Sequence, residues 1–130
     1  MAVPNIAKAE LHPDWVKLFD DTTSLDGTLR TCLVLVYEDG SQSIASALKH
    51  EKIDGVPSAL YDITPSKDVV RMIVSIYDGS KTINLISLYP PEGENVMKGG
   101  ERYTFRMFIR LKGAEWLGVK EQAQEEQTQT

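Results

Sequence analysis

The stretch from Arg102 to Lys112 constrains the fold more than any other part of this chain. Its odd positions are all apolar, and its even positions are mostly charged or polar. Strict alternation of this kind is the signature of a β-strand with one buried and one solvated face. We therefore expect a strand here whose odd face belongs to the core, formed by Tyr103, Phe105, Met107, Ile109 and Leu111.

The solvated face of this strand is the candidate binding site. We call it the basic stripe, and it consists of Arg102, Arg106, Phe108, Arg110 and Lys112. Arginine pairs bidentately with phosphate and carboxylate, and an aromatic side chain on a sheet stacks on a base. Three partners fit the stripe: acidic residues of the same chain, an acidic segment of a second copy, or a nucleic acid or anionic membrane.

The charge balance bears on that choice. The chain has a net charge of -5 at pH 7, which argues against generic binding to nucleic acid or anionic lipid. Residues 98–112 hold five cations against Glu101 alone, so their local charge is +4 and the rest of the chain sums to -9. The imbalance favours an acidic partner within the protein itself, in one chain or between copies.

The other apolar runs predict further strands. Leu29–Tyr37 is apolar on both faces at its centre, which is typical of a central strand covered on both sides. Val69–Tyr77 and Thr82–Tyr89 flank Asp78-Gly79-Ser80, a turn sequence that predicts a hairpin. The alternation slips in the second of these strands, which predicts a bulge near Leu85 or burial on both faces.

Three segments are candidates for short helices. Asp14–Asp20 follows a proline and carries an apolar stripe of Trp15, Leu18 and Phe19. Ser43 suits the N-cap of a helix from Ile44 to about Glu51, whose alanines favour a helix. In the alternative, Asp39-Gly40 closes a hairpin and Gln42–Ala47 returns as a strand. The third segment, Val56–Tyr61, is a further helical turn or an edge segment. Together these elements predict an α+β fold, mainly an antiparallel meander of four or five strands with two or three short helices.

At 130 residues the chain is expected to form one domain. We assign residues 1–13 to an N-terminal arm, 14–119 to the globular domain and 120–130 to a disordered polar tail with nothing to bury. No apolar run approaches the roughly 18 residues of a membrane span, and the N-terminus does not resemble a signal peptide. The single cysteine, Cys32, is expected to be a small buried hydrophobe, which favours a reducing, cytoplasmic location.

No catalytic or metal-binding constellation is recognisable in the sequence. The candidate ligands His12, His50 and Cys32 lack close spacing, and we expect His50 at a solvated helix end. No serine lies in a GxSxG motif, and Gly99-Gly100 fits no phosphate-binding loop. We therefore expect neither a cofactor, a metal nor enzymatic activity.

These features favour a non-enzymatic structural or assembly protein that self-associates into a homo-oligomer through a sheet edge or an apolar face. The order of strand, turn, short alanine-containing helix and β-meander resembles that of the small matrix proteins of negative-strand RNA viruses. No motif is shared, and the acidic charge departs from the usual matrix pattern. The resemblance implies a viral or phage structural protein, located in the host cytoplasm or the virion. The alternatives are a protein that binds nucleic acid or anionic membranes through residues 102–112, and a small ligand-binding protein or enzyme.

Overall fold

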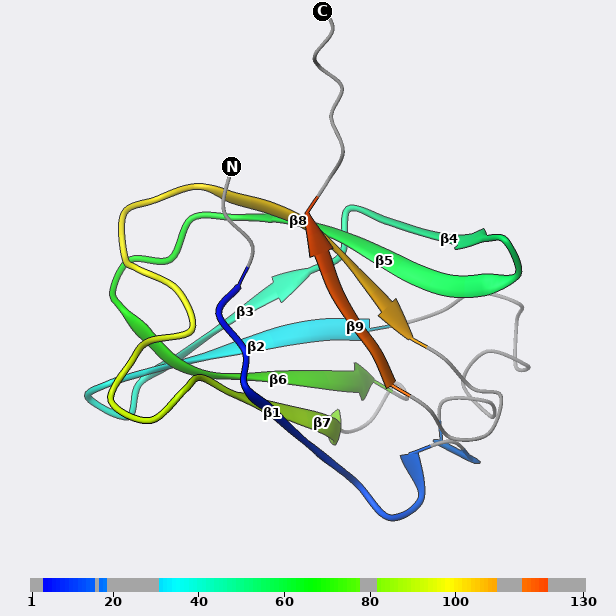
Figure 1. Ribbon diagram of the computed structural model, residues 1–130, viewed down its shortest axis with the longest axis horizontal. Coiled ribbons are helices and arrows are strands. Elements are labelled where there is room, and N and C mark those ends of the chain that lie inside the picture. The colour runs from blue at the N-terminus through cyan, green and yellow to red at the C-terminus, as the bar shows by residue number, and fades with distance from the viewer. Residues whose placement is uncertain (1–3, 16, 19–30, 78–81, 110–115, 122–130) are drawn as a thin grey trace, which may run out of the picture.

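The computed structural model describes residues 4–15, 17–18, 31–77, 82–109 and 116–121. These residues form two antiparallel sheets (Figure 1). The five-stranded sheet has the order β1-β7-β6-β2-β3 and the four-stranded sheet has the order β4-β5-β8-β9. The strands are β1 (Lys8–Leu11), β2 (Thr31–Tyr37), β3 (Gln42–Ser46), β4 (Lys49–Ile53), β5 (Val56–Ile63), β6 (Val69–Tyr77), β7 (Thr82–Tyr89), β8 (Tyr103–Ile109) and β9 (Trp116–Glu121).

The expected α+β fold is wrong, because every secondary-structure element among the described residues is a strand. Of the first predicted helix, Asp14–Asp20, the structure describes one helical turn, in which the N–H of Leu18 donates to the C=O of Asp14 at 2.9 Å. Trp15 in this turn is 3% exposed and belongs to the core. A single turn of helix gains little stability of its own, so the packing of Trp15 decides its conformation. Phe19 and Asp20 lie outside the described residues.

The second predicted helix is the strand β3, as in the hairpin alternative. Gly40 has a φ of 89°, its N–H donates to the C=O of Tyr37, and the N–H of Tyr37 donates to the C=O of Ser41. This is a three-residue hairpin loop that ends in a glycine bulge. Ser43, the expected N-cap, instead lies with its Oγ 2.7 Å from the Oη of Tyr37. The tight turn returns the chain along β2, and this pairing outweighs the helix propensity of the alanines.

The remaining part of that helix, and the third helical segment, form the hairpin β4–β5. Ile53 pairs with Val56 across a two-residue loop, Asp54-Gly55. Both loop residues have positive φ, 52° and 81°, as the favoured type I′ turn requires. The Asp-Gly dipeptide in the sequence is a strong hairpin signal. The strand before it, β4, consists mostly of charged residues and therefore lacks the apolar alternation that predicts a strand.

The central strands agree with the sequence pattern. β2 lies between β3 and β6, and β6 pairs with β7 as expected. The pairing steps from Val74–Ile86 to Ser75–Asn84, so Leu85 is the extra residue of a bulge and the predicted slip is confirmed. Leu85 and Ile86 are both 1% exposed, because the bulge turns two successive side chains inward.

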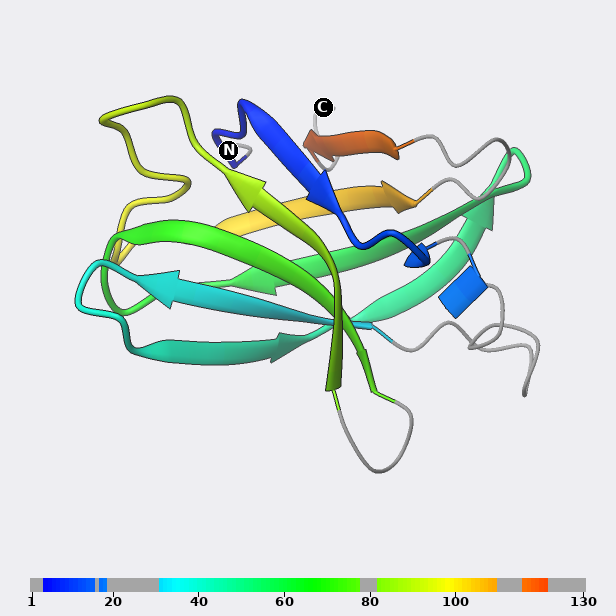
Figure 2. The same cartoon turned by 90° about the horizontal axis from the view of Figure 1, so that it is seen from below.

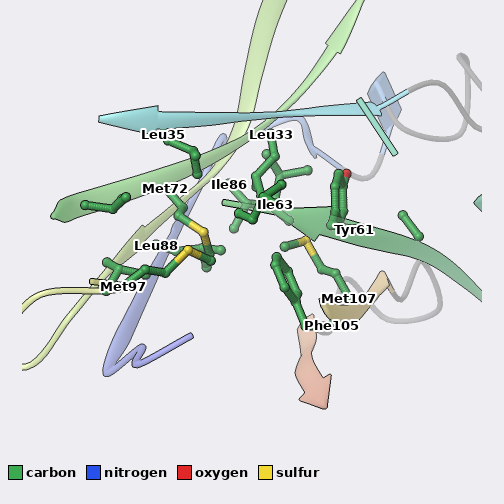
Figure 3. Packing of buried hydrophobic residues seen from close by; sticks show 14 of the residues in the cluster. Leu33, Leu35, Tyr61, Ile63, Met72, Ile86, Leu88, Met97, Phe105 and Met107 are labelled. Atoms are coloured by element: carbon green, nitrogen blue, oxygen red, sulfur yellow. The ribbon is translucent and has the colours of Figure 1, made fainter. Parts of the chain in front are cut away.

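The core fills the space between the two sheets (Figure 3). Tyr61 of β5 and Phe105 of β8 are both 0% exposed, and their ring centroids lie 5.5 Å apart. The predicted buried face of the Arg102–Lys112 strand is confirmed for Tyr103, Phe105 and Met107. The side chains of Ile109 and Leu111 lie outside the described part of the chain.

The segments at the two ends of the chain contribute to the sheets. Lys8–Leu11, within the segment assigned to an arm, form β1 and pair with β7. β9 reaches Glu121, and residues 122–130 lie outside the described residues. The loop between β7 and β8 places Val96 and Met97 in the core, each 2% exposed.

Candidate functional site

The basic stripe lies on the face of the four-stranded sheet that points away from the core. β8 is flanked there by β5 and β9, and its even-numbered side chains lie opposite the core residues of the same strand. In register, Arg106 pairs with Leu60, Thr104 pairs with Asp62, and Phe108 pairs with Ser58. Arg110 and Lys112 lie outside the described residues, so the structure places only Arg102, Arg106 and Phe108 of the stripe.

Arg102 forms a bidentate ion pair with Asp62 of β5. Its Nε donates to Oδ1 at 2.9 Å, and its Nη2 donates to Oδ2. The Oγ1 of Thr104 also donates to Oδ1, at 3.2 Å. The hydrogen bonds from Arg102 hold the pKa of Asp62 below its ordinary value, and Asp62 raises the pKa of Arg102 in return. Two parallel N–H···O bonds of this kind fix the guanidinium in one orientation.

Arg106 is held more tightly still. Its Nη1 lies 2.7 Å from Oε2 of Glu51 on β4 and donates to the Oγ of Ser58 at 3.3 Å. That Oγ in turn donates to the backbone C=O of Glu51 at 3.3 Å. The Arg106 side chain is 11% exposed and Ser58 is 0% exposed, so this network is nearly shielded from water.

Two arginines of the stripe thus have acidic partners within the same chain. Their pairing requires β4, β5 and β8 to be neighbours, which the spacing of residues along the chain does not reveal. Phe108 is half-buried beside them, opposite Ser58 and Gly118. The described part of the stripe is therefore an internally neutralised surface and not a row of available cations.

A second surface, whose residues the sequence pattern did not single out, is the edge formed by β3. Among the described strands β3 pairs with β2 alone, and Figure 2 shows it at the margin of its sheet before the chain continues into β4. Ile44 on β3 is 68% exposed and Leu48, two residues after the strand, is 65% exposed. Along β3 the exposed residues Gln42, Ile44 and Ser46 alternate with the half-buried residues Ser43 and Ala45.

Ile44 continues an apolar row that crosses three strands. Val34 of β2 pairs with Ile44 on one side and with Ile73 of β6 on the other. Their side chains point away from the core, because Leu33 and Leu35 of the same strand point into it. Val34 is 6% exposed and Ile73 is 3% exposed, so the row is covered at its centre and open to solvent at Ile44.

A polar cluster connects the two sheets next to the core. The Oγ1 of Thr31 lies 2.8 Å from the Oη of Tyr61 and 3.2 Å from the Nε2 of His50. Burial raises the pKa of Tyr61 to about 12 and lowers the pKa of His50. The expectation that His50 lies at a solvated helix end is wrong: it is a half-buried residue of β4. These three groups satisfy one another as neutral hydrogen-bonding partners.

Other chemistry-bearing groups are separate from this cluster. Cys32 is a free thiol, half-buried, whose pKa is raised by burial, so it is protonated at neutral pH. Within the described ranges, no three His, Cys, Asp or Glu side chains group as a metal site would require. An open depression of about 460 Å³ is lined by polar and apolar residues of the β7–β8 loop together with Asn5 and Tyr103.

The part of the chain that the structure describes has no helix of the length and apolarity that a bilayer span requires. No protein-family model, curated protein or solved structure matches this chain.

Proposed function

We propose that this chain is a non-enzymatic structural protein that works by assembling with copies of itself. The observation that carries the proposal is the open edge at β3, where two large apolar side chains are exposed to solvent. An unpaired strand offers a row of backbone donors and acceptors to another strand. Fully burying one aliphatic side chain contributes about 1.5–3 kcal/mol, so Ile44 and Leu48 give such a contact a substantial driving force.

The ion pairs of the basic stripe weigh against the alternative of nucleic-acid or membrane binding. A phosphate would have to displace Asp62 from Arg102 and Glu51 from Arg106, and the second arginine is hardly accessible. The remaining stripe residues, Arg110 and Lys112, lie outside the described residues. The acidic net charge of -5 weighs in the same direction.

The resemblance to small viral matrix proteins depends on a short helix from Ile44 to about Glu51. Strands β3 and β4 occupy that segment instead. We place the assembly in the cytoplasm, because a single free thiol suits a reducing compartment.

Light scattering on the full chain over a range of concentrations, at low and at high salt, tests the proposal. We expect a molar mass that rises above the 14.5 kDa of one chain as concentration increases. High salt should leave the association intact, because the edge carries no charge to screen. A strictly monomeric species up to the solubility limit at both salt concentrations would overturn the proposal.

A further inference from the structure

The edge strand β3 differs from the other sheet edges that the structure describes. The edge strands are β1, β3, β4 and β9. All of them except β3 contain lysine. Lys8 lies on β1, Lys49 and Lys52 lie on β4, and Lys120 lies on β9. Edge lysines hinder pairing with another strand. The sequence of β3, Gln-Ser-Ile-Ala-Ser, has no charge and no proline.

The β2–β3 hairpin determines which backbone N–H and C=O groups of β3 face the open edge. The N–H of Tyr37 donates to the C=O of Ser41, so these two residues form a hydrogen-bonded pair. Bonded and non-bonded pairs alternate along an antiparallel ladder. Gln42, Ile44 and Ser46 therefore direct their backbone N–H and C=O groups away from β2, toward the open edge.

We propose that two copies of this chain pair through β3, antiparallel, about a two-fold axis at Ile44. The inference rests on the self-association proposed above and specifies its interface. In this register Ile44 faces Ile44 of the second copy, and Gln42 faces Ser46 on either side. All outward-directed groups of both strands are then satisfied. Any shift along the strand leaves outward groups of Gln42 or Ser46 unpaired, so this register satisfies the most hydrogen bonds.

The side chains on the outer face support the same register. The row from Ile73 through Val34 to Ile44 meets its symmetry copy at the axis, so it becomes one continuous apolar band across the joined sheets.

These features favour a second copy of the chain as the binding partner of the β3 edge. A strand edge with a two-fold related pattern of donors, acceptors and apolar side chains is complementary to itself. The result is a continuous ten-stranded sheet built from two five-stranded ones.

Disulfide trapping with two single-cysteine variants tests the register. Both variants carry Cys32→Ser, because Cys32 pairs directly with Ser46 across β2 and β3 and would compete for a new thiol. One variant then carries Gln42→Cys and the other carries Ser46→Cys. Facing residues of a bonded pair have Cα atoms about 5.5 Å apart, within the range of a disulfide. Like residues of the two copies lie four positions apart, about 13 Å, which is too far.

We expect mild oxidation of the mixture to give a covalent dimer that joins one chain of each variant. Each variant alone, and a control with Leu48→Cys in the same background, should stay uncrosslinked. Covalent dimers of Gln42→Cys alone would overturn the register. Light scattering on the Cys32→Ser parent shows whether the chain self-associates. If the parent associates but the mixture gives no covalent dimer, the β3 interface proposed here is wrong, while the proposed self-association stands. A monomeric parent would overturn both.

Discussion

The guanidinium of Arg106 lies 2.7 Å from the carboxylate of Glu51, on the face of the four-stranded sheet away from the core. The contact joins β8 to β4 across the intervening strand β5. Because the arginine side chain is only 11% exposed, the carboxylate of Glu51 compensates its charge where water hardly reaches it. Arg106, which the sequence presents as a candidate binding residue, thus connects two strands of the fold.

Replacing Glu51 by Gln should destabilise the protein by about 1–3 kcal/mol, because Arg106 would lose the charge of Glu51 beside it in a shielded position. Urea unfolding followed by circular dichroism measures the change. Glu92→Gln, at an exposed loop position, is the matched control and should leave the free energy of unfolding unchanged. Equal stability of the two variants would show that the Arg106–Glu51 pair contributes nothing.

The ion pair between Arg102 and Asp62 should make the fold sensitive to acid. The pKa of Asp62 is lowered in the folded protein, so its contribution to stability is present above its ordinary value of 3.8 and is lost as the pH falls through the folded value. Asp62→Asn should flatten the decline of the unfolding midpoint below about pH 4. Asp54→Asn, in the β4–β5 turn, is the control and should keep the wild-type decline. A wild-type decline in Asp62→Asn as well would refute this role.

His50 should add a second, milder pH dependence. Burial lowers its pKa, so the folded protein favours the neutral ring. Its contribution to stability is therefore complete above the ordinary value near 6.5 and decreases as the pH falls below it. Thermal unfolding of His50→Gln between about pH 7.5 and 5.5 should be less pH-dependent than that of the wild type. The control His12→Gln should unfold with the same pH dependence as the wild type. If wild type and His50→Gln have identical slopes, His50 does not contribute to the pH dependence of stability.

Gly99 should not tolerate a side chain. A Cβ at this position would lie 2.6 Å from the backbone Cα and C of Lys67, where two loops meet. Gly99→Ala should therefore cost about 1–3 kcal/mol, because one of the two backbones has to move. Gly100→Asn is a suitable control, since its positive φ of 84° is tolerated by asparagine and no atom lies in the way. Comparable stability of Gly99→Ala and wild type in urea unfolding would contradict the close approach.

Long period-two patterns in the sequence predicted the strands well. The buried face of Tyr103, Phe105 and Met107 and the β6–β7 pairing follow from local alternation, which the sheets preserve. The helix expected from Ile44 was wrong, because alanine propensity is a weak preference and the turns at Gly40 and Gly55 outweigh it.

The candidate site was less predictable than the fold. The partners of Arg102 and Arg106 come from β5 and β4, which are distant in sequence, and only the order of strands in the sheet brings them together. The open edge at β3 is likewise a property of the assembled sheet. No local pattern around Ile44 shows that a strand has a neighbour on one side alone.

The central claim is that this chain self-associates through β3, and sedimentation equilibrium of Ile44→Lys tests it most directly. A lysine at the centre of the edge would place two like charges at the proposed axis. Thr82→Lys adds the same charge at an exposed position of β7 and serves as the control. We predict that the wild type and Thr82→Lys associate while Ile44→Lys, with an unchanged circular dichroism spectrum, sediments as a single chain. Association of Ile44→Lys equal to that of the wild type, or a wild type that is monomeric throughout, would contradict the account.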